Sequence, residues 1–270
     1  MKYVPGYDAF RKFFEEQVEA SVDPSKLNWP HARYYITVLV DDNCTICPIA
    51  LRLLEATEKA RGEELDITAI NIDHAEAPLK PKATPAFCAS LVPGDYKRCV
   101  YWEGIAIDGW EKLISLKLAK AYVYTHPRLP ELLARITEYA KASGYVVVPD
   151  GKLRFKLLRE LLENWDRYGR PYCPCRPERS DRTVCPCVYA RADIAKMGHC
   201  LCGLFWSRQL AEKWIELQKK RYAKLIEEID KVIKVLEEFK DAVILNEGDA
   251  ADYVAQALMD LAAEIQSLSS

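Results

Sequence analysis

Hydrophobic residues in the first half of the chain alternate between helical spacing and β-rich runs. The helical pattern covers 7–20 and 49–60 and returns near residue 108, whereas β-rich runs cover 34–41, 64–73 and 97–102. The last of these runs follows a turn centred on residues 93–94, which indicates a hairpin. Strands and helices in this order predict an α/β domain.

The helical period dominates the second half. Helices are predicted at 131–142, 152–165, 204–245 and 251–268. A break at 126–130 and a second one around 144–149 favour a domain boundary near residues 146–151. The predicted domains are therefore 1–147 and 148–270, and the second is expected to be all-α.

The last two helical patterns carry apolar residues at alternating steps of three and four, which is a heptad seam. Only the short polar segment 246–249 separates them, so an antiparallel helical hairpin is predicted. This hairpin could cap the second domain, pack against the first or dimerise. Packing within the chain is favoured.

Composition excludes several classes of protein. The 270 residues include 38 basic and 40 acidic side chains, and a net charge of -2 does not favour a nucleic-acid partner. The early apolar residues are mixed with charged ones, unlike a signal peptide, and no apolar run approaches the ~20 residues of a membrane span. We therefore expect a cytoplasmic protein with no membrane partner, in which clustered cysteines bind metal or perform redox chemistry.

The first candidate site is the C-x-x-C motif of Cys44 and Cys47, which stands between the run 34–41 and the next helix. Unpaired N–H groups and the dipole at a helix N-terminus stabilise a thiolate, so the pKa of Cys44 is expected to fall below ~8.5. Pro48 suits the first turn of such a helix. The alternatives are half of a zinc site or two buried thiols.

In its C-x-x-C motif, its element order and its Thr84-Pro85 pair, the stretch from residue 34 to about 122 resembles a thioredoxin or glutaredoxin-type domain. The resemblance implies that Pro85 is a cis-proline beside a redox-active disulfide of Cys44 and Cys47. The two residues inside the motif differ from the Gly-Pro of thioredoxins, so the redox potential and the partner do not follow from it.

Two cysteines and three histidines before residue 130 are assigned no chemistry. Cys88 and Cys99 fall on the two strands of the predicted hairpin, where buried free thiols are expected. His31, His74 and His126 are isolated in loops, and we expect them at the surface.

Six of the ten cysteines lie within residues 173–202, as three C-x-C pairs. The pairs are Cys173-Pro-Cys175, Cys185-Pro-Cys187 and Cys200-Leu-Cys202. Zinc or a cubane iron–sulfur cluster uses four thiolates, which leaves two thiols for a redox centre. Zinc in a small interaction module is the alternative, although C-x-C pairs suit zinc poorly.

From about residue 150 to 210, the three ordered pairs and the Gly-Leu-Phe that follows them closely resemble the catalytic chain of ferredoxin:thioredoxin reductase, an all-helical iron–sulfur protein. The resemblance implies that the second and sixth cysteines, Cys175 and Cys202, form a redox-active disulfide. It also implies that the other four bind a [4Fe-4S] cluster; these ligands are Cys173, Cys185, Cys187 and Cys200.

The same resemblance implies that Cys175 attacks a substrate disulfide and that Cys202 resolves the mixed disulfide. That family carries a histidine between the last two cysteines, whereas this chain has Leu201 there and His199 just before Cys200. His199 is predicted either to transfer a proton or only to order the loop.

Together these patterns predict a ferredoxin-dependent disulfide reductase. An α/β thioredoxin-like domain would precede an all-α iron–sulfur domain with a C-terminal helical hairpin. Electrons would pass from ferredoxin to a thioredoxin or another protein disulfide, the chain's own Cys44–Cys47 being one candidate. The rival interpretations are a metal-stabilised interaction module without turnover and a thiol oxidoreductase with a different donor.

Local charge bears on the donor. Residues 151–210 contain twelve basic and six acidic side chains. A basic surface near the cluster would attract an acidic ferredoxin and raise its association rate. The alternative is a solvated surface with no partner.

Overall fold

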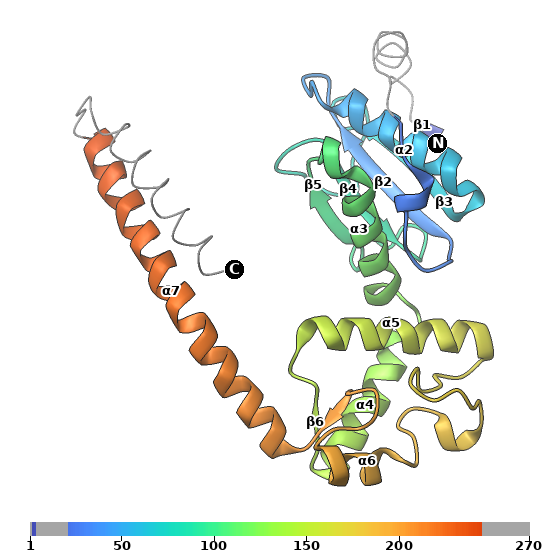
Figure 1. Ribbon diagram of the computed structural model, residues 1–270. Coiled ribbons are helices and arrows are strands. Elements are labelled where there is room, and N and C mark those ends of the chain that lie inside the picture. The colour runs from blue at the N-terminus through green and yellow to red at the C-terminus, as the bar shows by residue number, and fades with distance from the viewer. Residues whose placement is uncertain (1, 4–20, 245–270) are drawn as a thin grey trace.

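The computed structural model describes residues 2–3 and 21–244 of the chain. The helices expected at 7–20 and 251–268 lie outside the described residues, so the C-terminal hairpin stays a prediction. Figure 1 shows an upper part built on a β-sheet, a lower helical part and one long helix that leaves the lower part. The predicted order, in which an α/β unit precedes helices, is confirmed.

The upper part is a five-stranded sheet in the order β1-β3-β2-β4-β5. β1 and β2 run parallel to β3, whereas β4 is antiparallel to β2 and β5. The strands are β1 (Lys2–Tyr3), β2 (Tyr34–Val40), β3 (Leu65–Asn71), β4 (Ala86–Ser90) and β5 (Val100–Glu103). β2 lies at the centre of the sheet, which explains why its residues are apolar on both faces.

Helices α2 (Cys47–Arg61) and α3 (Trp110–Tyr124) pack on one face of this sheet. Val38 of β2 shares a buried core with Leu54 of α2 and Leu118 of α3, whereas Leu39 belongs to a separate cluster. Neighbouring residues of a strand point to opposite faces, so this division follows from the period of two. Short 3-10 helices, η1 (Pro24–Lys26), η2 (Gly62–Glu64) and η3 (Ile107–Gly109), lie in the connections.

The lower part combines helices with a small antiparallel sheet that the sequence did not predict. The helices are α4 (Leu129–Ser143), α5 (Gly151–Tyr168), η4 (Asp181–Thr183), α6 (Ala190–Met197) and α7 (Arg208–Ile244), and the paired strands are β6 (Val146–Val147) and β7 (Phe205–Trp206). The ring of Tyr139 in α4 also packs on Phe205, with 4.8 Å between centroids. These contacts join residues on both sides of the boundary predicted near residue 147.

Helix α5 has the clearest sequence logic. Its N-cap, Asp150, accepts hydrogen bonds from the backbone N–H groups of Lys152 and Leu153 at 2.8 and 3.1 Å. Gly169 ends the helix in the left-handed region, with φ of 76°, where a residue without Cβ is favoured. Its buried residues follow the predicted apolar face; they are Leu157, Leu158, Leu161, Leu162 and Trp165.

The two parts meet where α3 packs on α5. Tyr122 donates its hydroxyl to the Asp166 carboxylate at 2.7 Å, and His126 Nε2 lies 3.1 Å from the same oxygen. His126 is only 5% exposed, so its predicted surface position is wrong. The ring packs edge-on against Tyr122 at this interface, which sequence position does not reveal. His31 and His74 are exposed, as predicted.

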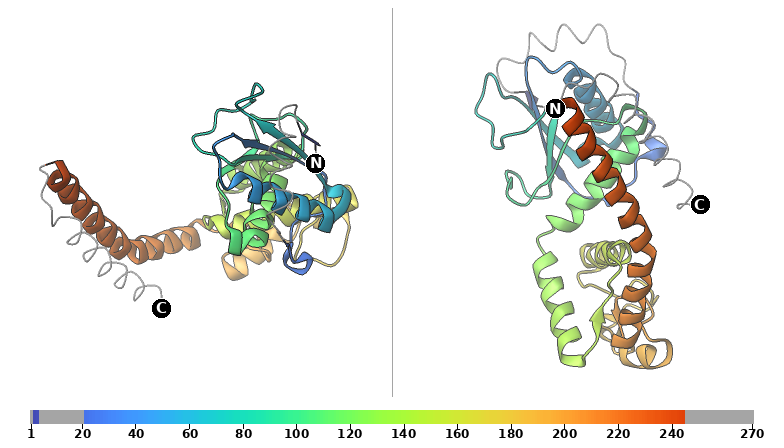
Figure 2. Two further views of the ribbon diagram at one scale, coloured as in Figure 1. Left: turned by 90° about the horizontal axis from the view of Figure 1, so that it is seen from above. Right: turned by 90° about the vertical axis from the view of Figure 1, so that its left-hand side faces the viewer.

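The sheet is oriented so that one end faces α5. Trp29 and His31, which precede β2, line a cavity together with Arg159 and Glu163 of α5. β2 then runs away from α5, so the C-x-x-C motif that follows it lies at the far end of the upper part (Figures 1 and 2). Helix α7 extends away from both parts. Across the described ranges, the chain contains no helix long and apolar enough for a membrane crossing.

Candidate redox site

The first two cysteine pairs are brought together by backbone hydrogen bonds between the loops that carry them. The N–H of Cys173 donates to the carbonyl of Thr183 at 2.8 Å, and the N–H of Cys185 donates to the carbonyl of Pro171 at 2.9 Å. The first cysteine of each pair is therefore fixed opposite the other. Loops held in this way can present several sulfurs to one point.

The six cysteines, all free thiols in the structure, differ in burial. Cys175 is exposed and Cys202 is partly exposed. The four predicted ligands are each at most 8% exposed; they are Cys173, Cys185, Cys187 and Cys200. The four buried cysteines are thus the ones that the resemblance implies as cluster ligands, and the two more exposed ones, Cys175 and Cys202, are the ones that it implies as the redox pair.

Cys202 lies among the other sulfurs. Its Sγ is 3.6 Å from that of Cys200 and within hydrogen-bonding reach of Cys173 and Cys175. The contact with Cys173 contributes most to raising the pKa of Cys202. The hydrogen bond with Cys202 in turn lowers the pKa of Cys175, and that of Cys200 to about 7. The predicted redox partners Cys175 and Cys202 are therefore neighbours in space.

The remaining thiols influence one another as well. A hydrogen bond between Cys173 and Cys187 lowers the pKa of Cys173 and raises that of Cys187. Burial raises the pKa of Cys185, and the charges of Cys173 and Cys200 add to this effect. All six sulfurs therefore belong to one electrostatic cluster.

Backbone N–H groups point at the buried sulfurs. Phe205 donates its N–H to Cys200 Sγ at 3.3 Å, and neighbouring N–H groups do the same for Cys173 and Cys187. Such donors stabilise thiolates, and four shielded thiolates are what a [4Fe-4S] cluster requires, so the donor set fits that cluster. In the part of the chain that the structure describes, no three His, Cys, Asp or Glu side chains are arranged so that they could hold a metal ion.

Asp193 of α6 ties the two outer cysteine pairs together, a role that sequence reasoning missed. Its Oδ2 accepts a hydrogen bond from Arg176 Nη2 at 2.7 Å and one from the backbone N–H of Leu201 at 3.3 Å. Arg176 directly follows Cys175, and Leu201 directly precedes Cys202. An acidic residue midway between the second and third pairs was the only signal in the sequence.

His199 is bound to its own loop. Its Nδ1 lies 2.8 Å from the carbonyl oxygen of Cys200. A carbonyl oxygen can only accept, so Nδ1 carries the hydrogen in this contact. His199 also forms an isolated β-bridge with Trp206. These contacts order the loop; a role in proton transfer stays a prediction.

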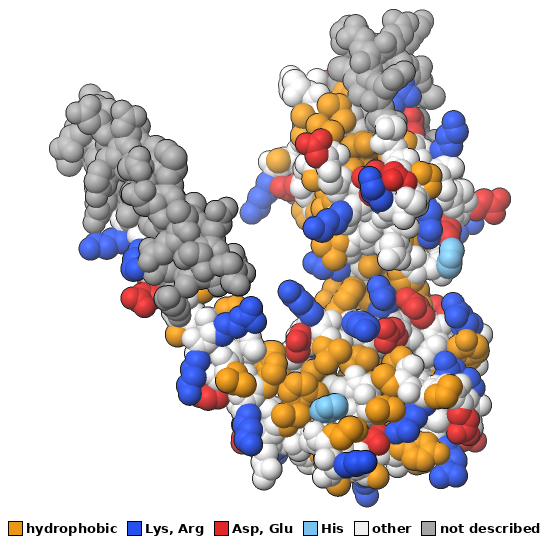
Figure 3. All heavy atoms as spheres, viewed as in Figure 1, with side chains coloured by type: hydrophobic (Ala, Val, Ile, Leu, Met, Phe, Trp, Pro, Cys, Tyr) orange, Lys and Arg blue, Asp and Glu red, His pale blue; other side chains and the backbone are white. Residues whose placement is uncertain are grey.

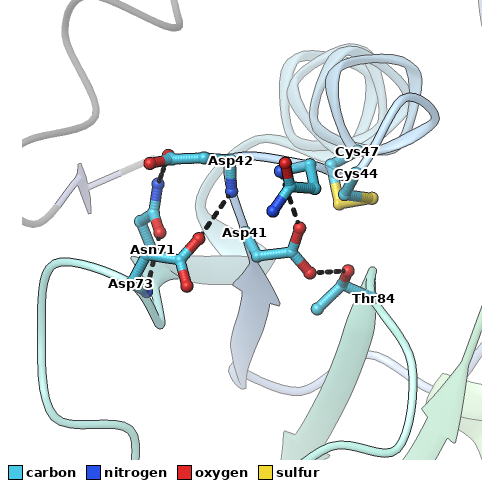
Figure 4. The surroundings of a disulfide bond; sticks show 8 residues. Asp41, Asp42, Cys44, Cys47, Asn71, Asp73 and Thr84 are labelled. Carbon is cyan, nitrogen blue, oxygen red and sulfur yellow. Dashed lines mark hydrogen bonds between the residues drawn. A yellow bond between two sulfur atoms is a disulfide. The ribbon is translucent and has the colours of Figure 1, made fainter.

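Cys44 and Cys47 form a disulfide at the end of β2 (Figure 4). Helix α2 begins at Cys47, so the expectation that Cys44 stands at the helix N-terminus is not met. Cys44 lies in the preceding turn, where its carbonyl accepts the N–H of Cys47 at 3.3 Å. Cys44 is 8% exposed and Cys47 is fully buried, which makes Cys44 the more accessible sulfur.

The turn that carries Cys44 is joined to the loop before β4. Asp41 accepts the N–H of Asn43 at 2.9 Å and also the hydroxyl of Thr84 (Figure 4). The Thr84–Pro85 peptide is cis. Sequence reasoning missed Asp41, whose only signal was an acidic residue between a strand and the C-x-x-C motif.

The prediction of free thiols at Cys88 and Cys99 is wrong, because the structure joins them in a disulfide. Cys88 pairs with Tyr101 across β4 and β5, and Cys99 precedes Tyr101 by two residues. Residues two apart share a face of a strand, so Cys88 and Cys99 are diagonal neighbours. Cys99 lies just before β5 and is half-buried.

Comparison with known families supports the second resemblance. Residues 126–238 match the family described as ferredoxin thioredoxin reductase catalytic beta chain. The match includes all six clustered cysteines and begins before the predicted domain boundary. No curated protein matches the sequence. The thioredoxin-like resemblance of the upper part stays a prediction.

Proposed function

From the match of residues 126–238 to the catalytic beta chain family of ferredoxin thioredoxin reductase, we propose that the protein is a ferredoxin-dependent disulfide reductase. The family points to a disulfide oxidoreductase of this type. The observation that carries the proposal is the burial pattern, in which Cys175 is exposed, Cys202 is partly exposed and the other four thiols are buried. A [4Fe-4S] cluster held by those four would supply electrons one at a time.

The two outer cysteines would carry the disulfide chemistry. Cys175 is exposed, and the hydrogen bond with Cys202 lowers its pKa, which suits a nucleophile that attacks a substrate disulfide. The attack would form a mixed disulfide and release one substrate thiol. Cys202, beside it, would then attack Cys175 and release the second substrate thiol. Two electrons and two protons thereby reach the substrate, and the Cys175–Cys202 disulfide that remains must be reduced again.

The upper part would be a thioredoxin-like domain. Its central strand β2 is followed by a C-x-x-C disulfide and helix α2, and two helices cover one face of a mixed sheet. The Cys44 sulfur, which belongs to the less buried cysteine of the disulfide, would accept the attack of a reductase thiol. A thioredoxin-type disulfide, including the Cys44–Cys47 bond of this protein, is the proposed class of substrate.

The donor would be an acidic ferredoxin. In Figure 3, Lys and Arg side chains are spread over the visible face of the lower part, with hydrophobic side chains between them. The excess of basic residues in 151–210 gives this part a positive surface. Such a surface attracts an acidic protein and raises its association rate at low ionic strength.

Anaerobic purification tests the cofactor. A brown protein with about four iron and four sulfide per chain is expected. A colourless protein with one zinc would overturn the proposal and support the metal-stabilised interaction module.

A second experiment tests the donor. In protein first oxidised to the Cys175–Cys202 disulfide, reduced ferredoxin should make Cys175 accessible to alkylation, as measured by peptide mass spectrometry. If only a dithiol reductant does so, the protein is a thiol oxidoreductase with a different donor. High salt should slow the ferredoxin reaction more than the dithiol reaction, because only the former depends on charge attraction.

A further inference from the structure

The two cysteine centres lie on opposite sides of helix α5. On one side of α5, Arg159 and Glu163 line the cavity shared with the upper part. On the other side, Asn164 donates to the carbonyl of Tyr172 at 2.8 Å, and Tyr172 directly precedes Cys173. β2 starts beside that cavity and leads away from α5 toward the turn that precedes α2 (Figure 1). A strand of seven residues spans about 23 Å. Sulfur–sulfur exchange needs direct contact, so Cys175 does not reach Cys44 in this arrangement.

The junction does not act as a flexible linker. Only four residues, 125–128, connect α3 to α4, and His126 among them is buried. Arg128 donates to the carbonyl of Trp165 at 3.2 Å, and its guanidinium lies over the Trp165 ring at 5.5 Å. Tyr122 and His126 both contact Asp166.

Apolar packing also spans the junction. One continuous buried core contains residues of both parts, including Leu118 of α3 and Leu158 of α5. Opening the junction far enough to bring the two disulfides together would expose this core to water, which is unfavourable. A tethered site that cannot reach its target gains nothing from the tether.

We propose that the Cys44–Cys47 disulfide is reduced in trans, by the Cys175–Cys202 centre of a second copy of this chain. The inference rests on the proposed reductase function and names the route by which electrons reach the upper part. Cys175 is exposed, and Cys44, with 8% of its surface exposed, is the less buried cysteine of its own disulfide. Two copies can therefore bring these sulfurs together without any change at the junction.

The exchange is balanced for sulfur and for electrons. The reduced Cys175 of one copy attacks Cys44 of the other, forms a mixed disulfide and displaces Cys47 as a thiol. Cys202 then attacks Cys175 and releases Cys44 as a thiol. One copy ends with a Cys175–Cys202 disulfide and the other with two thiols, and two electrons from an external one-electron donor, together with two protons, must restore the first copy.

A mixing experiment tests this route. The donor copy carries Cys44→Ser and Cys47→Ser, and the acceptor copy carries Cys175→Ser together with a tag that alters its mass. Both are full-length proteins that are purified anaerobically. Dithionite-reduced methyl viologen is supplied as the electron donor, to the acceptor copy alone and to the mixture of the two copies. The redox state of Cys44 in the acceptor is followed by alkylation and mass spectrometry. We expect the acceptor disulfide to stay oxidised alone and to be reduced once the donor copy is added.

Dilution of the wild-type protein separates the two routes. When the protein is diluted tenfold, the observed first-order rate constant of a bimolecular reaction falls about tenfold, whereas that of an internal reaction does not change. A concentration-independent rate would overturn the trans route and leave the reductase function intact. The trans route would also be overturned if the acceptor disulfide stayed oxidised while Cys175 of the donor copy became alkylatable. If Cys175 never becomes alkylatable in wild type, the proposed function itself fails.

Discussion

Arg176 donates to the Asp193 carboxylate at 2.7 Å, and the same oxygen accepts the N–H of Leu201, so one side chain fixes the two segments that carry Cys175 and Cys202. Both partners of this ion pair are at most a quarter exposed. Hydrogen bonds that involve charged groups are the stronger class, and this one constrains the separation of the two thiols of the proposed redox pair. Asp193 is thus a positioning residue for the proposed redox pair.

Replacing Asp193 tests this role. Asp193→Asn is expected to keep the iron content and to lower the rate of disulfide reduction about tenfold, which corresponds to ~1.4 kcal/mol. The rate is measured with a small disulfide substrate under saturating reductant. Asp181→Asn is the matched control, because Asp181 pairs with Arg170 but its side chain is 86% exposed. Loss of iron from Asp193→Asn alone would show that the carboxylate supports the fold of the site instead.

The burial difference among the six cysteines leads to a second prediction. Cys175→Ser is expected to keep the brown colour and lose disulfide reduction, because an exposed nucleophile is removed and no ligand is lost. Cys187→Ser is expected to lose iron, because one of four buried thiols is removed. Iron analysis and the visible spectrum of both variants check this. A colourless Cys175→Ser protein would contradict the ligand assignment.

Much of this arrangement followed from local sequence patterns. Helix α5 has a capping aspartate, an apolar stripe and a terminal glycine, so its pattern predicted it closely. The three C-x-C pairs likewise identified the cysteine cluster, because their spacing is itself the signal. In both cases the information lies within a few neighbouring residues.

What the sequence did not predict depends on distant contacts. The Cys88–Cys99 disulfide requires the register of β4 against β5, which the hairpin turn alone does not specify. His126 is buried because it packs at the interface with α5, forty residues later. The separation of Cys44 from Cys175 depends on which end of the sheet faces α5, and no local pattern encodes that choice.

The junction contributes stability that depends on pH. Burial tends to raise the pKa of Asp166, but hydrogen bonds from His126 and Tyr122 outweigh it, so the pKa is lowered. A carboxylate with a lowered pKa stabilises the fold above its unfolded pKa of about 3.9, and this contribution is lost as the pH falls through the folded pKa. Asp166→Asn is therefore expected to lower the free energy of unfolding at pH 7 by about 1 kcal/mol.

Urea unfolding at several pH values measures this effect. The difference between wild type and Asp166→Asn should shrink as the pH falls below about 4, because the wild-type carboxyl is then protonated. Tyr122→Phe tests the other partner of the same hydrogen bond, since it removes only the hydroxyl that donates to Asp166. The double variant should lose less than the sum of the single variants. Additive losses would mean that Tyr122 and Asp166 stabilise the junction independently.

The contact between His199 Nδ1 and the Cys200 carbonyl allows the role of this histidine to be tested with a substitution that keeps this one hydrogen bond. The amide nitrogen of asparagine can take the place of Nδ1, whereas that of glutamine takes the place of Nε2. If His199 orders the loop, His199→Asn keeps most of the rate of disulfide reduction, and His199→Ala lowers it about tenfold, or ~1.4 kcal/mol, by losing one hydrogen bond. The pH profiles of wild type and His199→Asn should then have the same shape. A His199→Asn protein that is as slow as His199→Ala, with a flattened pH profile, would instead assign proton transfer to the imidazole.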